Sequence, residues 1–119
     1  MRQLRILLVE DDAVVGALLA ELLVGIGHDV CRIAMTENEA ISAAVSESPD
    51  LMLVDAHLRQ GSGIAAMKAI LRHGPMPHVF MTGNSRLTMP ADAVVLRKPF
   101  GITDLIAVLD GVTGCCARP

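Results

Sequence analysis

The chain has 119 residues, which is enough for about one domain with a single hydrophobic core. Hydrophobic residues make up 52% of it, but no run approaches the roughly 20 apolar residues of a membrane-spanning helix. The apolar part of the N-terminus is too short for a secretory signal. We therefore expect a cytoplasmic protein that does not engage a membrane. A net charge of -3 and two aromatic residues leave neither a basic surface nor a stacking platform, which argues against direct nucleic-acid binding.

Short apolar runs predict five strands along the chain. The third is the most distinct, because an unbroken apolar run ends in a single carboxylate, Asp55. Such runs are typical of strands buried on both faces inside a parallel sheet. The five strands are expected at residues 5–9, 28–34, 49–55, 78–82 and 93–97.

Apolar residues at helical spacing fill most of the intervals between these strands. A capping-box pattern, Thr36 followed by Glu39, marks the start of the second helix. The interval before the last strand differs, because Gly83, Asn84 and Pro90 favour turns, and we expect a short or mobile fourth helix there. The other helices are expected at 13–26, 36–46, 62–73 and 102–112, with a tail over 113–119.

Strands that alternate with helices predict an α/β fold, a doubly wound three-layer sandwich with a parallel sheet. Ligands of such sheets bind outside the carboxyl ends of the strands. Polar residues follow several of the predicted strands at this edge, namely Glu10, Asp11 and Asp12, Asp55, Thr82 and Lys98. We therefore expect them to share a shallow cleft.

The residue types in this predicted cleft suit phosphoryl chemistry. Two carboxylates about 5 Å apart repel by roughly 3 kcal/mol at an effective dielectric near 20, and Mg²⁺ relieves such repulsion while keeping positions for phosphate oxygens. Asp55 is a candidate covalent nucleophile, and Thr82 and Lys98 could bind the oxygens of the transferred group. Each residue also has a structural alternative, such as a helix N-terminus for Asp11 and Asp12. Their joint placement favours the chemical interpretation.

Four segments together resemble the receiver domain of bacterial two-component response regulators: Leu8-Val9-Glu10-Asp11-Asp12, Leu53-Val54-Asp55, Thr82-Gly83 and Lys98-Pro99-Phe100. The resemblance covers nearly the whole chain, with residues 1–112 as the receiver domain. It implies a flavodoxin-like five-stranded sheet with the order 2-1-3-4-5. It also implies that a sensor histidine kinase or a histidine phosphotransfer protein supplies a phosphoryl group to Asp55.

The resemblance further implies roles for individual residues. Asp12, Asp55 and the backbone carbonyl of His57 would ligate Mg²⁺ directly, and Asp11 would act through water. Thr82 and Lys98 would hold the phosphoryl oxygens, and their movement would carry the signal outward.

Several residues depart from the usual receiver pattern. Arg59 stands where most receivers have proline, and Leu96 stands where an aromatic residue commonly rotates with the threonine of the fourth strand, so that switch cannot operate here. The segment Phe80-Met81-Thr82-Gly83 resembles a receiver subset, often stand-alone, whose fourth strand ends Phe-Ala-Thr-Gly; Met81 and Asn84 depart from its signature. The side chains of His57 and Asn84, two positions after Asp55 and Thr82, would flank the path of an attacking water. They could either speed or slow dephosphorylation.

No output domain is expected after the last helix, so output would pass through a docked protein partner, or the protein would act as a phosphate sink or relay. Two alternatives differ in class. Aspartate-nucleophile phosphatases related to haloacid dehalogenases have a second acid two residues after the nucleophile, where this chain has His57. A receiver-like docking module that works without phosphorylation tends to lose the acids present here. We therefore expect a signalling phosphoacceptor and not an enzyme with an external substrate.

Overall fold

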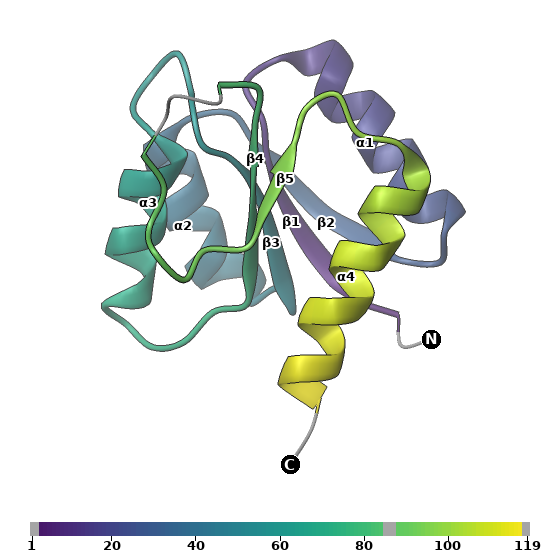
Figure 1. The fold of residues 1–119 in the computed structure, drawn as a ribbon. Helices are drawn as coiled ribbons and strands as arrows, with labels where there is room; N and C mark the ends of the chain where they lie inside the picture. Colours follow the sequence, from purple (N-terminus) through teal and green to yellow (C-terminus); the bar gives the residue numbers. More distant parts are fainter. Residues whose placement is uncertain (1–2, 85–87, 118–119) are drawn as a thin grey trace.

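A computed structural model describes residues 3–84 and 88–117, with side chains up to residue 112. Its five strands form one parallel sheet in the order β2-β1-β3-β4-β5, which confirms the predicted fold class and strand order (Figure 1). The strands are β1 (Arg5–Val9), β2 (Asp29–Ala34), β3 (Leu51–Asp55), β4 (His78–Thr82) and β5 (Val95–Arg97). The helices are α1 (Ala13–Gly25), α2 (Glu37–Glu47), α3 (Gly63–Leu71) and α4 (Ile102–Ala117).

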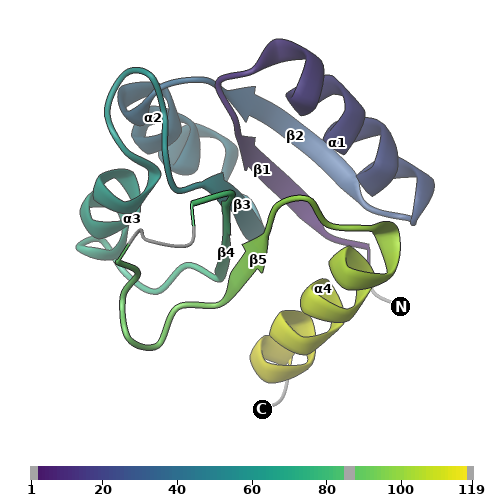
Figure 2. The same ribbon diagram turned by 45° about the horizontal axis from the view of Figure 1, so that its top comes forward.

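The helices cover the two faces of the sheet in pairs, α2 with α3 and α1 with α4 (Figure 2). Successive side chains of a strand point to opposite faces, so β3 contributes to both cores. Met52 and Val54 pack in the α2–α3 core, whereas Leu51 and Leu53 pack in the α1–α4 core. All five residues of β3 are buried, as expected of a central strand in a three-layer sandwich.

Helices α1 and α2 both begin at side-chain caps, and the cap of α2 differs from the predicted capping box in one detail. The hydroxyl of Thr36 accepts the N–H of Glu39 at 3.1 Å, as predicted, but the Glu39 carboxylate accepts the N–H of Met35 at 3.0 Å instead of that of Thr36. Helix α1 begins after Asp12, whose carboxylate accepts the N–H groups of the first turn. None of the described helices is both long and apolar enough to span a membrane.

The segment between β4 and β5 contains no helix in its described residues, 83–84 and 88–94. The prediction of a short or mobile fourth helix also covers 85–87, which lie outside the described residues. Before β5 the chain turns, with the N–H of Ala93 bonded to the carbonyl of Pro90 at 3.0 Å, so the strand begins two residues later than predicted. At the other end, α4 continues to Ala117, into the segment predicted as a tail.

Candidate functional site

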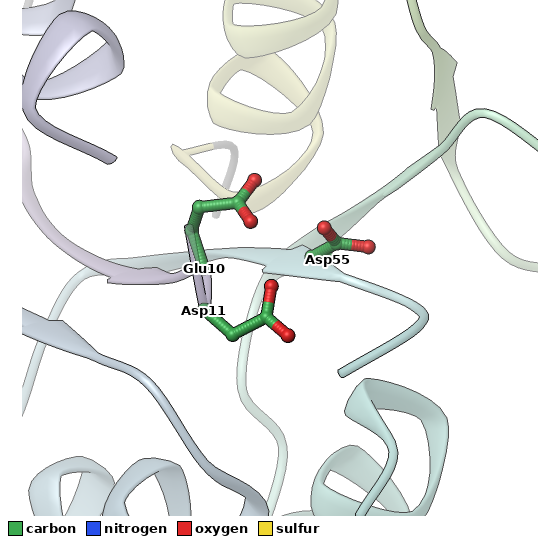
Figure 3. A group of neighbouring side chains, drawn as sticks. All are labelled: Glu10, Asp11 and Asp55. Atoms are coloured by element: carbon green, nitrogen blue, oxygen red, sulfur yellow. The ribbon is translucent and has the colours of Figure 1, made fainter. Parts of the chain in front are cut away.

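Three carboxylates meet at the carboxyl end of the sheet, from Glu10 and Asp11 after β1 and from Asp55 at the end of β3 (Figure 3). One carboxylate oxygen of each lies within 4.8 Å of the others. Strands β1 and β3 are neighbours, with Val9 paired to Val54, and this register puts the two acidic ends side by side. Glu10 and Asp55 are both buried, at 2% and 8% exposure, so their charges have little solvent to stabilise them.

Lys98 joins two of these carboxylates through its ammonium group. Nζ lies 2.9 Å from Oε1 of Glu10 and 3.0 Å from Oδ2 of Asp55. The backbone N–H of Lys98 donates to the carbonyl of Thr82 at 2.8 Å, which fixes the residue directly after β5. Asp55 and Lys98, which the sequence predicts to share a cleft at this edge of the sheet, are therefore in direct contact in the structure.

Burial and charge shift the pKa values of two members of this group, Glu10 and Lys98. Burial raises the pKa of the Glu10 carboxyl above its ordinary value, and the hydrogen bond from Lys98 only partly opposes that shift. Burial alone would lower the pKa of Lys98, but its hydrogen bonds to Glu10 and Asp55 outweigh this and raise it. The ammonium therefore stays charged, and one positive charge faces three carboxylates. The remaining negative charge favours a divalent cation.

The loop from β3 to α3 lies close to Asp55. The N–H of His57 donates to Oδ1 of Asp55 at 3.0 Å. A Cβ at Gly63 would overlap the carbonyl oxygen of Asp55, so only glycine lets α3 begin so close to the end of β3. Ser62 caps that helix by accepting the N–H groups of Ile64 and Ala65 at 3.1 and 3.2 Å. The loop that leaves Asp55 therefore comes back into contact with Asp55 where α3 begins.

Thr82 lies at the same edge of the sheet, between the strand of Asp55 and Lys98. Its side chain is buried, and its hydroxyl accepts the N–H of Asn84 at 3.0 Å and donates to the carbonyl of Asn84 at 3.4 Å. The hydroxyl is therefore engaged in a turn at the end of β4. Leu96, which replaces the common aromatic residue, is buried in β5 beside Met81.

The structure does not bring Asp12 into the acidic group. Oδ1 of Asp12 accepts the N–H groups of Val14 and Val15 at 2.9 and 3.1 Å, so the carboxylate serves as the N-cap of α1. The predicted metal ligand Asp12 thus lies outside the group, whereas Glu10, which the predicted ligand set omitted, lies within it. The sequence itself indicates this capping role for Asp12, because an aspartate directly before a helical segment is a typical N-cap.

The donor set of the group fits Mg²⁺ better than a softer metal. Every side chain in it offers carboxylate oxygen, and among the described residues no cysteine or histidine joins the cluster. Mg²⁺ prefers such oxygen ligands and keeps several positions for water and phosphate. The site therefore combines the buried carboxylate of Asp55, a lysine ammonium and a group of acids that can hold a hard cation.

Comparison with known proteins agrees with this geometry. Residues 6–110 match the family described as the response regulator receiver domain. The phyllosphere-induced regulator PhyR of Methylorubrum extorquens is 33% identical over 110 residues, which cover 87% of this chain and 41% of PhyR. The transcriptional regulatory protein PdtaR of Mycobacterium tuberculosis is 31% identical over 112 residues, which cover 89% of this chain and 55% of PdtaR.

Solved structures extend this likeness to the fold. The solution structure of the PhyR receiver domain of Erythrobacter litoralis superposes with a TM-score of 0.83 at 26% identity, covering 98% of this chain and 95% of that domain. The response regulator PhyR of Brucella abortus gives a TM-score of 0.82 at 27% identity, covering 98% of this chain and 53% of that protein. The chain thus spans about half of the full-length PhyR proteins it matches.

Proposed function

Since the chain belongs to the response regulator receiver domain family, we propose that it accepts a phosphoryl group on Asp55 and signals to a protein partner. The observation that carries this proposal is the position of Lys98, whose ammonium contacts Asp55 while Asp11 and Glu10 complete an acidic group around the same carboxylate. We infer that the phosphodonor is a histidine kinase or a histidine phosphotransfer protein, and that the protein works in the cytoplasm.

In the proposed reaction a carboxylate oxygen of Asp55 forms a bond to phosphorus as the bond from phosphorus to the donor imidazole breaks. The imidazole nitrogen leaves with the bonding electron pair and takes a proton. Mg²⁺ held by Asp11, Asp55 and the backbone carbonyl of His57, with Glu10 in the role first given to Asp12, would neutralise charge on the transferred group. Positioning and electrostatic stabilisation account for most of the catalysis of such transfers.

Lys98 and Thr82 have the chemistry to hold the product. The Lys98 ammonium already touches Oδ2 of Asp55, and a short movement would take it to a phosphoryl oxygen. The Thr82 hydroxyl would have to leave Asn84 to do the same. That exchange would move the turn after β4, so phosphorylation would change the surface that follows this strand. We propose that a protein partner recognises this change.

The test compares the wild type with Asp55→Asn after incubation with acetyl phosphate and Mg²⁺. Intact mass spectrometry should show the addition of one phosphoryl group to the wild type only, and EDTA should prevent it. Loss of the added mass in hydroxylamine would identify an acyl phosphate. A wild type that gains no mass, or an Asp55→Asn variant that gains as much, would overturn the proposal, and the first result would favour a docking module that works without phosphorylation.

A further inference from the structure

Glu37, the first residue of α2, lies against the loop that follows Asp55. Its carboxylate oxygen Oε1 accepts the N–H of Ser62 at 2.9 Å, and its own backbone N–H donates to the carbonyl of Gln60 at 3.2 Å. Gly61 lies between them with φ +88°, and a Cβ there would lie 2.5 Å from both Cβ and Oε1 of Glu37. Three consecutive loop residues thus pack against Glu37, Gln60 against its backbone and Gly61 and Ser62 against its side chain.

The part of the loop held by Glu37 is paired with the part that faces the site. Ser62 and His57 form an antiparallel bridge, and the N–H of Gly63 donates to the carbonyl of Ala56 at 3.1 Å. His57 in turn donates its N–H to Oδ1 of Asp55. A shift of Ser62 would therefore be passed to the backbone of His57, two residues beyond the phosphoacceptor.

The Glu37 carboxylate does not lie where the carboxylate of an acid in the first turn of a helix ordinarily lies. Such an acid is favourable because it faces the partial positive charge of its own helix N-terminus. Glu39, also in the first turn of α2, behaves in this local way and accepts the N–H of Met35. Glu37 instead reaches the N-cap residue of another helix, α3, whose N–H is partly buried and would lose its acceptor without this carboxylate.

We propose that Glu37 is a positioning residue for the phosphoacceptor site. By holding Gln60 and Ser62, it fixes the loop so that the backbone of His57 keeps its place beside Asp55, where its carbonyl would help to hold Mg²⁺. Groups that orient metal ligands from outside the coordination sphere commonly change metal affinity 10- to 100-fold when removed. This inference rests on the proposed function, because it concerns the Mg²⁺ that the phosphoacceptor site would hold.

The experiment compares Glu37→Ala and Glu37→Gln with the wild type and with Glu39→Ala as a matched control. Mg²⁺ affinity is measured by titration calorimetry, and hydrogen exchange of the Ser62 amide is measured by NMR in the metal-free protein. Glu37→Ala should weaken Mg²⁺ binding about 10-fold and speed exchange at Ser62. Glu37→Gln keeps an oxygen acceptor of the same reach, so it should remain near the wild type in both measurements, as should Glu39→Ala.

Three results would overturn the role of Glu37: unchanged Mg²⁺ affinity in Glu37→Ala, equal weakening in the alanine and glutamine variants, or equal weakening in Glu39→Ala. The second would mean that charge and not the hydrogen bond is responsible. If the wild type itself bound no Mg²⁺, the proposed function would fail. Exchange at Ser62 in the alanine and glutamine variants would still decide whether Glu37 holds the loop.

Discussion

The backbone amide of Arg59 donates a 2.7 Å hydrogen bond to Oδ2 of Asp11, and this contact ties the β3–α3 loop to the end of β1 across 48 positions of sequence. The guanidinium of Arg59 is near the same oxygen, with Nε at 3.9 Å, but the side chain is 81% exposed. Exposed ion pairs contribute little to stability, so the backbone amide of Arg59, and not its charge, holds Asp11 in place.

The two contributions of Arg59 can be separated by substitution. Arg59→Ala keeps the amide and removes a positive charge, so Mg²⁺ binding at low ionic strength should stay equal or become slightly tighter. Arg59→Pro also removes the amide, so Asp11 loses its donor and Mg²⁺ binding should weaken by up to about 10-fold. Proline is the usual receiver residue at this position, so we expect the variant to fold. Titration calorimetry measures the Mg²⁺ affinity of both variants. Tighter binding by the proline variant than by the alanine variant would contradict the role given to the Arg59 amide.

Substitutions of the adjacent residues Asp11 and Asp12 should have different effects, the first on Mg²⁺ affinity and the second on stability. Asp12 caps α1, so Asp12→Ala should lower the free energy of unfolding by about 1 kcal/mol and leave Mg²⁺ affinity near the wild-type value. Asp11 belongs to the acidic group, so Asp11→Ala should abolish measurable Mg²⁺ binding. Urea denaturation and Mg²⁺ titration of the two variants test this. Loss of Mg²⁺ binding in Asp12→Ala would restore the ligand set first expected from the sequence.

Lys98 should stabilise the metal-free protein more than the metal-bound one. Lys98→Met keeps most of the apolar stem but leaves the buried carboxylates of Glu10 and Asp55 without their shared donor, at a cost of about 1–3 kcal/mol. Mg²⁺ would compensate part of this loss, because it supplies positive charge to the same acids. Urea unfolding with EDTA and with Mg²⁺ gives the two values. Equal losses under both conditions would show that Lys98 and the cation do not share these carboxylates.

Much of the fold could be predicted because β3 and β4 are short apolar runs with clear ends, and β4 has the predicted limits. The assignment of the adjacent acids was harder, because sequence alone does not show which one caps α1 and which faces Asp55. β5 was predicted too long because local turn formation at Ala93 competes with sheet pairing. The contacts of Lys98 with Glu10 join residues 88 apart, so they depend on the packed sheet and have no local pattern.

His28 is a buried histidine that the site does not use. Its Nδ1 accepts the N–H of Leu4 at 3.1 Å, so the neutral ring carries its proton on Nε2. That Nε2 is buried and has no hydrogen-bond partner among the described residues. Burial lowers the pKa of His28 below its ordinary value of 6.5, and the negative charge of Asp110 only partly opposes the shift.

This lowered pKa predicts a loss of stability in mild acid. Below pH 6.5 the unfolded chain takes up a proton at His28 that the folded protein does not yet bind, so the free energy of unfolding should fall as the pH drops from 6.5 toward the folded-state pKa. His28→Asn offers an acceptor for Leu4 but does not titrate, so its stability should depend less on pH across this range. His73→Asn, at an exposed position, controls for the loss of a histidine. Urea unfolding at a series of pH values measures the slopes, and a slope in His28→Asn as steep as in the wild type would mean that other groups cause the acid sensitivity.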